Sequence, residues 1–408
     1  MKINKAYKIR IYPNIIQKET FEKYFGVCRF VWNSVLGYKI DSYKHGIKYS
    51  AYNAIKDFTI IKKLEGYEWM NEIDSQVLQQ SILNLEKAYL NFFRRVKQGK
   101  KELGFPKFKS KHKRQNSFRV PKDFKIDFKN KKIKIPKIDW IKFKDKRIFD
   151  SKIKSITISK NKCNQYFASI LVEKDFEINL PIEIQESKVF SADMSCKNFL
   201  VSSEMEFENQ KFYRRKERRL KIRHRKFSKK KNDSNNFEKQ RVVLAKTYLN
   251  ITNQRTGFQW NLAHELVSKF DVLIFEDLNI EGMKQFNKGI SKTVTLDFSF
   301  SEFLTNLKWK AFKANKHFVT TDRWFPSSKL CSNCGQVKKE LLLSERTYIC
   351  DCGLEIDRDL NASINIKREG INLLKNSTVI KTESYACGNM SEDLNNSAQE
   401  IYYLKGFY

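Results

Sequence analysis

Four of the eight cysteines in this chain stand in two close pairs. Cys331 and Cys334 are followed by a glycine, and Cys350 and Cys352, also followed by a glycine, come after an interval of fifteen residues. Two such turns direct four thiolates toward one tetrahedral Zn²⁺. The second pair is one residue shorter than the usual spacing, and disulfides are the alternative. Because an intracellular protein keeps its thiols reduced, we predict a structural zinc site.

Three carboxylates stand at the ends of predicted elements. Asp193 follows the short apolar run 188–192, and Glu276 follows the more strongly apolar run 271–275. Asp359 lies in the first turn of a predicted helix, where the helix dipole favours an acid. Phosphodiester hydrolysis uses acidic side chains of this kind to hold two divalent cations, and oxygen ligands suit Mg²⁺. The chain has 46 acidic residues, most of which must be caps or surface ion pairs, so the pattern alone leaves this role open.

The spacing of apolar residues indicates the elements that position these groups. Alternation with period two over 5–12, ending at Pro13, predicts a strand, whereas 17–97 has the helical period. Residues 102–180 predict short strands in which lysines and aromatic residues alternate, and the aromatic residues serve either as core or as platforms for base stacking. A long amphipathic helix is predicted from about 238 to 269. We therefore predict an α+β fold with several domains.

The positive charge is concentrated in two segments. The 408 residues include 79 Lys or Arg and 46 Asp or Glu, a net charge of +33. Residues 91–150 hold 22 basic and 6 acidic residues, and residues 211–231 hold 13 basic residues and one acid. Such blocks predict tracks for a phosphate backbone, bound through counterion release, although a solvated basic face is the alternative. The candidate nucleic-acid contacts are Lys107, Lys109, Lys111, Arg114, Arg214, Arg215, Arg218, Arg219, Arg223 and Arg225.

The sequence shows neither a membrane span nor a secretion signal. A helix that spans a membrane needs about 20 apolar residues. No apolar run in this chain approaches that length. The first thirteen residues alternate basic and apolar side chains and lack the apolar core of a signal peptide. We therefore expect a cytoplasmic protein, associated with the nucleoid when it is bound to DNA, without a membrane partner.

Six runs of residues occur in an order that resembles one known family. They are 6–13, 25–33, 105–110, 274–283, 322–329 and 357–366, and the paired cysteines lie between the last two. With these runs the chain resembles the TnpB family, the transposon-associated OrfB-type proteins related to type V CRISPR effector nucleases. The resemblance extends from Lys5 to about Lys367.

The resemblance implies a RuvC-like nuclease domain of the RNase H type, interrupted by a zinc ribbon. It implies these boundaries: a wedge-like β-barrel over 1–13 and 102–185, a helical recognition insert over 14–101, the split nuclease domain over 186–322 and 356–370, the zinc ribbon over 323–355, and a poorly matching tail over 371–408.

The resemblance also implies the site and its ligands. Asp193, Glu276 and Asp359 match the catalytic acids that hold two Mg²⁺, and Asp359 is chosen over Asp357 because it directly precedes Leu-Asn-Ala. The implied partners are a guide RNA and double-stranded target DNA, and the implied activity is RNA-guided DNA cleavage for a transposon. Two alternatives stay open: a cleavage-deficient RNA-guided repressor, which Ser195 in place of the family's glycine allows, and a DNA-strand-transfer transposase.

Overall fold

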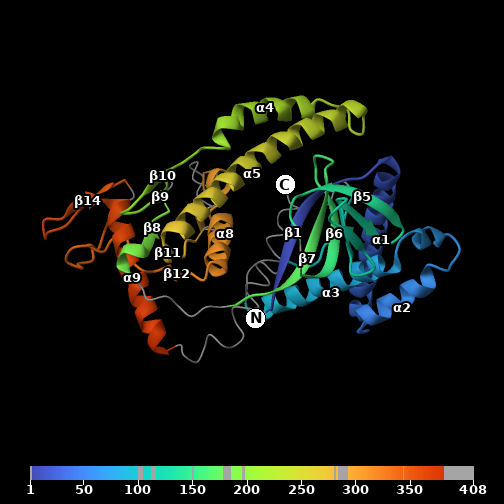
Figure 1. The fold of residues 1–408 in the computed structure, drawn as a ribbon, viewed down its shortest axis with the longest axis horizontal. Coiled ribbons are helices and arrows are strands. Elements are labelled where there is room, and N and C mark those ends of the chain that lie inside the picture. The colour runs from blue at the N-terminus through green and yellow to red at the C-terminus, as the bar shows by residue number, and fades with distance from the viewer. Residues whose placement is uncertain are drawn as a thin grey trace. The chain divides into compact units, whose positions relative to one another are not determined.

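The structure is a computed structural model. It describes the residues 2–99, 104–111, 116–148, 151–177, 185–194, 198–279, 282–283, 293–342 and 344–380. Between Phe176 and Glu177 the chain divides into two compact units, which Figure 1 colours from blue to green and from green to red. In the described residues no helix is long and apolar enough to cross a membrane.

In its described residues the first unit combines a seven-stranded antiparallel sheet with three α-helices. The sheet has the order β2-β6-β7-β1-β5-β4-β3 and curls beside the helices (Figure 1). The elements are β1 (Lys2–Tyr12), α1 (Ile15–Lys44), α2 (Ala51–Ile61), the 3₁₀ helix η1 (Glu68–Glu72), α3 (Ser75–Lys97), β2 (Asn116–Val120), β3 (Lys125–Asp127), β4 (Lys132–Ile135), β5 (Ile138–Lys144), β6 (Lys152–Lys160) and β7 (Tyr166–Asp175). The predicted strand over 5–12 is confirmed as part of β1, which pairs with β7 and β5.

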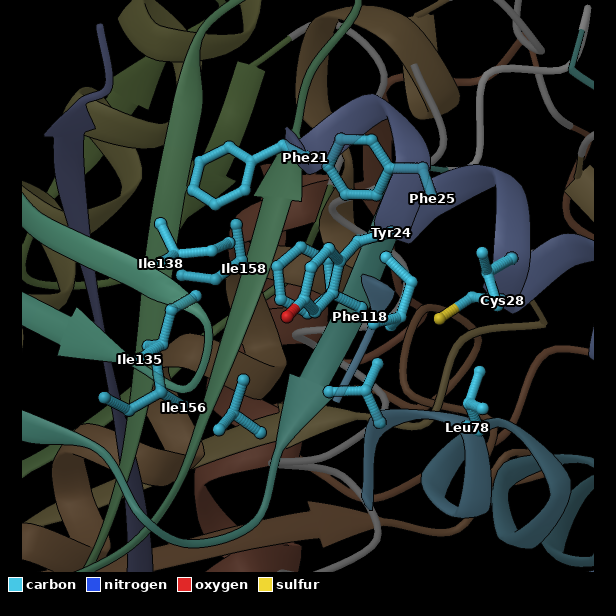
Figure 2. Packing of buried hydrophobic residues seen from close by; sticks show 14 of the residues in the cluster. Phe21, Tyr24, Phe25, Cys28, Leu78, Phe118, Ile135, Ile138, Ile156 and Ile158 are labelled. Carbon is cyan, nitrogen blue, oxygen red and sulfur yellow. The ribbon is translucent and has the colours of Figure 1, made fainter. Parts of the chain in front are cut away.

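Capping residues in the sequence mark where two helices of this unit begin. Asn14 and Gln17 form a reciprocal capping box at the start of α1, and Asp74 accepts a hydrogen bond from the backbone N–H of Gln76 at the start of α3. The predicted helical stretch is confirmed as separate helices rather than one. Buried rings join them to the sheet, because Phe21, Tyr24 and Phe25 of α1 face Phe118 of β2 (Figure 2).

The second unit contains a three-stranded parallel sheet with the order β12-β11-β8. Its elements are the 3₁₀ helix η2 (Glu186–Lys188), β8 (Val189–Ala192), β9 (Asn198–Val201), β10 (Glu206–Glu208), α4 (Arg214–Ser228), α5 (Asn235–Lys269), β11 (Val272–Glu276), the π-helix η3 (Thr293–Phe298), α8 (Phe300–Lys313), β12 (His317–Thr321), β13 (Thr347–Ile349), β14 (Glu355–Asp357) and α9 (Arg358–Ile380). The predicted long helix is confirmed as α5, and the predicted apolar strand is confirmed as β11.

Helices cover both faces of the parallel sheet, which explains why β11 is apolar at consecutive positions. Leu273 and Phe275 pack in one cluster with residues of α5 and α8, while Val272 and Ile274 pack in another with residues of α9. At Gly370 α9 lies very close to this sheet: a Cβ atom there would lie 2.3 Å from Cγ2 of Ile274. The sheet and α9 are thus in direct contact.

Candidate functional site

Asp193 is held at the carboxyl end of the parallel sheet. It follows β8 directly, its backbone N–H donates to the carbonyl of Val201 at 2.9 Å, and the N–H of Val201 donates back at 3.0 Å. In addition, the hydroxyl of Ser191 on β8 donates to the carbonyl of Ser363 on α9 at 2.8 Å. Hydrogen bonds to β9 and α9 therefore restrain the backbone at and just before Asp193.

Glu276 emerges at the same edge of the sheet. It is the last residue of β11, which runs parallel to β8 with Phe275 opposite Ala192. Glu276 and Asp193 are the residues that directly follow this pair, so they occupy corresponding positions at the ends of the two strands. Both side chains belong to half-buried residues.

Asp359 reaches this edge from the first turn of α9. Its neighbour Asp357 caps the helix. The Oδ1 atom of Asp357 accepts the backbone N–H of Asp359 at 2.9 Å and that of Leu360 at 3.1 Å. The structure thus gives Asp357 a capping role, whereas Asp359 is half-buried and its charge acts on Asp193.

The structure places the carboxylates of Asp359 and Glu276 near enough to Asp193 for their charges to act on it. Burial, followed by the charges of Asp359 and Glu276, raises the pKa of Asp193 to about 7. Burial and the charge of Asp277 raise the pKa of Glu276 to about 7 as well. Partly buried carboxylates with raised pKa values are typical of functional sites, because a structural role rarely requires acids to be packed together.

The four paired cysteines form a tight cluster whose Sγ atoms all lie within 4.8 Å of one another. Cys331 and Cys352 are 3.7 Å apart at sulfur, and Cys334 and Cys350 are 3.6 Å apart. A disulfide requires about 2.05 Å, whereas tetrahedral Zn–S bonds of about 2.3 Å separate two sulfurs by about 3.8 Å. The spacing therefore fits a four-thiolate metal site and excludes the disulfide alternative.

Hydrogen bonds within the cluster favour the thiolate form at one cysteine. The backbone N–H of Leu354 and the side chain of Asn333 lower the pKa of Cys352 to about 6. The shortened second pair closes through Gly353, and the first pair closes through Gly335, both with a positive φ in the left-handed region. Glycine adopts this conformation without a steric penalty, so the one-residue spacing is accommodated.

Two buried asparagines fasten the cysteine cluster to α9. The side-chain N–H of Asn361 donates to the carbonyl of Leu330 at 2.7 Å, while its Oδ1 accepts the N–H of Ser332 at 3.0 Å. One turn later, Asn365 donates to the carbonyls of Ser327 and Leu330 at 2.9 and 2.7 Å. The helix that begins beside Asp359 therefore also supports the first cysteine turn.

The basic residues proposed for nucleic-acid contact have different environments. On α4, Arg215, Arg218 and Arg225 are exposed, while Arg214 forms an ion pair at 3.4 Å with the buried Asp297. A cavity of 290 Å³ between α4 and α5 is lined by Lys216, Arg219, Arg223, Val243, Lys246, Thr247 and Asn250. Among these described lining residues none is acidic, so the cavity concentrates positive charge.

The lysines of the first basic block also differ from one another. Lys107 and Lys111 are exposed, but Lys109 is half-buried with its Nζ atom 3.6 Å from the ring centroid of Trp32. Burial lowers the pKa of Lys109 to about 8. The segment is held on α1, because Nε1 of Trp32 donates to the carbonyl of Lys107 at 3.0 Å. Arg114 and Ser195 lie outside the described residues.

Three family models match separate parts of the chain. A helix-turn-helix domain of OrfB_IS605 matches residues 1–48, the OrfB_IS605 probable transposase matches 169–287, and the Cas12f1-like TNB domain matches 300–366. A putative RNA-guided DNA endonuclease of Streptomyces pristinaespiralis is 29% identical over 374 residues, which cover 90% of each chain. The putative RNA-guided DNA endonuclease InsQ of Escherichia coli (strain K12) is 26% identical over 386 residues, covering 91% of this chain and 93% of that protein.

The chain belongs to the TnpB family. The resemblance seen in the sequence motifs is therefore confirmed. A solved structure is similar to this TnpB-family chain throughout: the cryo-EM structure of a Cas12f1–sgRNA–target DNA complex has a TM-score of 0.52 at 13% identity, covering 90% of this chain and 99% of that chain. At this identity the match establishes a Cas12f1-like fold that mixes helices and strands.

The sequence did not predict the residue that supports the start of the basic helix α4. The Oδ1 atom of Asp297 on η3 accepts the backbone N–H of Tyr213 at 2.7 Å and that of Arg214 at 3.3 Å. These bonds satisfy donors at the start of α4 that have no partner within the helix. Nothing near Asp297 in the sequence could have indicated this role. The two asparagines of α9 did carry a signal, since Asn361 and Asn365 are four residues apart on a helix with an apolar face.

Proposed function

We propose that this protein is an RNA-guided DNA endonuclease of a transposon, with a RuvC-type site formed by Asp193, Glu276 and Asp359. One observation carries the proposal: carboxylates at the ends of β8 and β11 and in the first turn of α9 lie near one another, and burial together with the charges of Asp359 and Glu276 raises the pKa of Asp193. The names of the relatives and of the Cas12f1 complex support the same activity.

The donor set fits Mg²⁺. Three half-buried carboxylates offer hard oxygen ligands, and a bound cation would relieve the repulsion that Asp193 experiences from Asp359 and Glu276. Mg²⁺ held by Asp193, Glu276 and Asp359 would supply activation of water and stabilisation of the leaving oxygen in phosphodiester hydrolysis.

The chain's own contribution is the placement of these carboxylates. The Val201 bridge and the Ser191 hydroxyl restrain Asp193, the in-register pairing of β8 and β11 restrains Glu276, and the cap at Asp357 restrains Asp359. Placement by packed elements matters because an error of about 1 Å in a catalytic group costs roughly 10²-fold in rate.

The basic surfaces supply binding. In an RNA-guided enzyme base pairing reads the target sequence, while the protein holds the duplex by its shape and phosphate charge. The cavity between α4 and α5, with Arg219, Arg223 and Lys246 in its wall, is suited to phosphate groups, and the exposed Arg215, Arg218 and Arg225 extend the charge along α4. The first basic block would contact guide RNA or the duplex beside the target.

The proposal includes the subdomains. The curled sheet of the first unit corresponds to a wedge-like β-barrel over 1–13 and 102–185, and α1 to α3 correspond to a recognition insert over 14–101. Residues 186–322 and 356–370 would form the split nuclease domain. The cysteine cluster would hold one structural Zn²⁺ within the ribbon over 323–355, and we propose no role for the tail.

The test begins with the protein's own RNA. The RNA that copurifies with the full chain is sequenced, and DNA duplexes matching it are incubated with Mg²⁺ or with EDTA. We expect Mg²⁺-dependent cutting of matched duplexes only, with 5′-phosphate products. Guide-dependent binding without cutting would instead support a repressor, and joining of DNA ends by RNA-free protein would support a transposase.

A further inference from the structure

Trp324 is the most exposed of the large apolar side chains in the described residues. It lies in the loop after β12 and is 85% exposed. Within the described part of the chain, its indole has no hydrogen-bonding or ring partner. A single exposed apolar side chain is ordinary by itself, but an exposed indole offers a large flat face that a ligand can cover with a favourable gain in free energy.

The loop holds Trp324 in a defined position. The backbone N–H of Trp324 donates to Oδ1 of Asp322 at 2.8 Å, and the N–H of Phe325 donates to the carbonyl of Asp322 at 3.2 Å. The guanidinium of Arg323 donates to Oδ2 of Asp277 at 2.8 Å. Trp324 is therefore exposed because the local turn presents it, not because its backbone lacks partners.

The contacts of this loop reach the two elements that carry Glu276 and Asp359. On the N-terminal side, Arg323 is bonded to the residue directly after Glu276. On the C-terminal side, the carbonyl of Ser327 accepts the Asn365 side chain from α9. Trp324 lies between these two attachments, so its position is tied to that of the acids.

Chain geometry limits the distance of Trp324 from the acids. Thr321 of β12 is paired with Glu276 of β11, and neighbouring strands lie about 4.8 Å apart. The three residues from Thr321 to Trp324 span at most about 11 Å. The Cα atom of Trp324 thus lies within roughly 16 Å of that of Glu276, a length of about four or five nucleotides at about 3.4 Å each.

We propose that the indole of Trp324 stacks on an unpaired base of the DNA strand being cut, within about five nucleotides of the scissile phosphate. This rests on the proposed nuclease function. Every nucleobase has a flat apolar face that an indole can cover, and such stacking tolerates any sequence, as a guided nuclease requires. The stacked base fixes the register of the strand at the carboxylates, so Trp324 is a positioning residue.

The experiment combines protein variants with abasic DNA. Target duplexes matched to the copurified RNA carry a single abasic site at each position within five nucleotides of the cut. Cutting by the wild type, Trp324→Ala and Trp324→Phe is measured under single-turnover conditions. From the strength of base–aromatic stacking, Trp324→Ala is expected to cut intact DNA roughly 5- to 150-fold more slowly, with Trp324→Phe close to the wild type.

The decisive result is loss of additivity at one position. There the abasic site slows the wild type but has no further effect on Trp324→Ala, since the base has lost its partner. Tyr43→Ala removes an aromatic residue that is 83% exposed in the first unit, and it must leave the abasic profile unchanged. Equal cutting by the wild type and Trp324→Ala, or additive effects at every position, would overturn the stacking proposal, whereas absence of cutting by the wild type would overturn the nuclease function itself.

Discussion

At Gly370 α9 packs closely against the central strand of the parallel sheet. A Cβ atom at this position would lie 2.3, 2.5 and 2.8 Å from Cγ2, Cδ1 and Cγ1 of Ile274. Carbon atoms pack best at about 3.5–4.0 Å, so Gly370→Ala requires a shift of more than about 1 Å. Ile274 has little freedom to move, because its strand pairs with β12 at Val319 and with β8 at Ser191.

The expected size of the effect follows from two opposing terms. Inserting a methyl group into a packed core costs about 1–3 kcal/mol, and replacing glycine by alanine in a helix recovers up to about 1 kcal/mol. All three contacts are below 3.0 Å, which puts the cost in the upper half of its range, about 2–3 kcal/mol, so we expect Gly370→Ala to lower the free energy of unfolding by about 1–2 kcal/mol. For a unit of this size that corresponds to a fall of roughly 2–8 °C in the transition temperature of the second unit. Because Asp359 is on the same helix, cutting should also slow.

Calorimetry of the full chain measures this transition, and Gly257→Ala is the matched control. Gly257 lies within α5, and a Cβ atom there would meet nothing within 4 Å, so alanine should stabilise by about 0.5–1 kcal/mol. Combining Gly370→Ala with Ile274→Ala should cost less than the sum of the single changes, since the truncation provides space for the new methyl group. If Gly370→Ala is as stable as the wild type, or if the two changes are additive, the contact between α9 and β11 is not as described.

Three further outcomes are expected. Burial lowers the pKa of Lys109 to about 8, from an ordinary value of 10.5. Between these two pH values the unfolded chain holds more protons than the folded chain, so the stability of the wild type, measured by calorimetry, should rise with pH relative to that of Lys109→Met. Parallel curves of stability against pH would contradict this. Asn361→Ala leaves the backbone N–H of the buried Ser332 without its acceptor, and denaturant unfolding should show a loss of about 1–3 kcal/mol. Unchanged stability would mean that the bond is absent. Cys331→Ser should reduce bound zinc from one per chain to none by elemental analysis, with Cys163→Ser as the control that retains it; zinc retained by both would exclude the four-thiolate site.

Features set by short-range signals could be predicted from the sequence. The alternation of apolar and polar residues over 5–12, ending at Pro13, predicted the first strand. The apolar run before Glu276 predicted the central strand, and the cysteine pairs predicted the thiolate cluster. In each case the residues that determine the structure are close together in the chain, and in the central strand they are apolar on both faces. The acids, in contrast, depended on family resemblance, because nothing local to Asp193 indicates that β8 pairs with β11.

Features set by distant partners could not be predicted. Asp297 satisfies the start of α4 from more than eighty residues away, and Lys109, chosen for its charge, packs against a tryptophan of α1. The resemblance favoured Asp359 over Asp357, but only the hydrogen bonds at the start of α9 show that Asp357 caps the helix. Such roles depend on tertiary contacts, which composition and periodicity do not encode.

The central claim is that the acids at the carboxyl end of the sheet cut DNA, and strand β11 offers a direct test at its two ends. Glu276→Gln removes the charge at the proposed site, whereas Asp271→Asn removes one at the opposite end, where Asp271 pairs with Lys316 at 3.0 Å. With matched DNA, Mg²⁺ and equal amounts of copurified RNA, we expect Glu276→Gln to cut about 10³-fold or more slowly and Asp271→Asn to cut like the wild type. Cutting by Glu276→Gln at the wild-type rate would contradict the account.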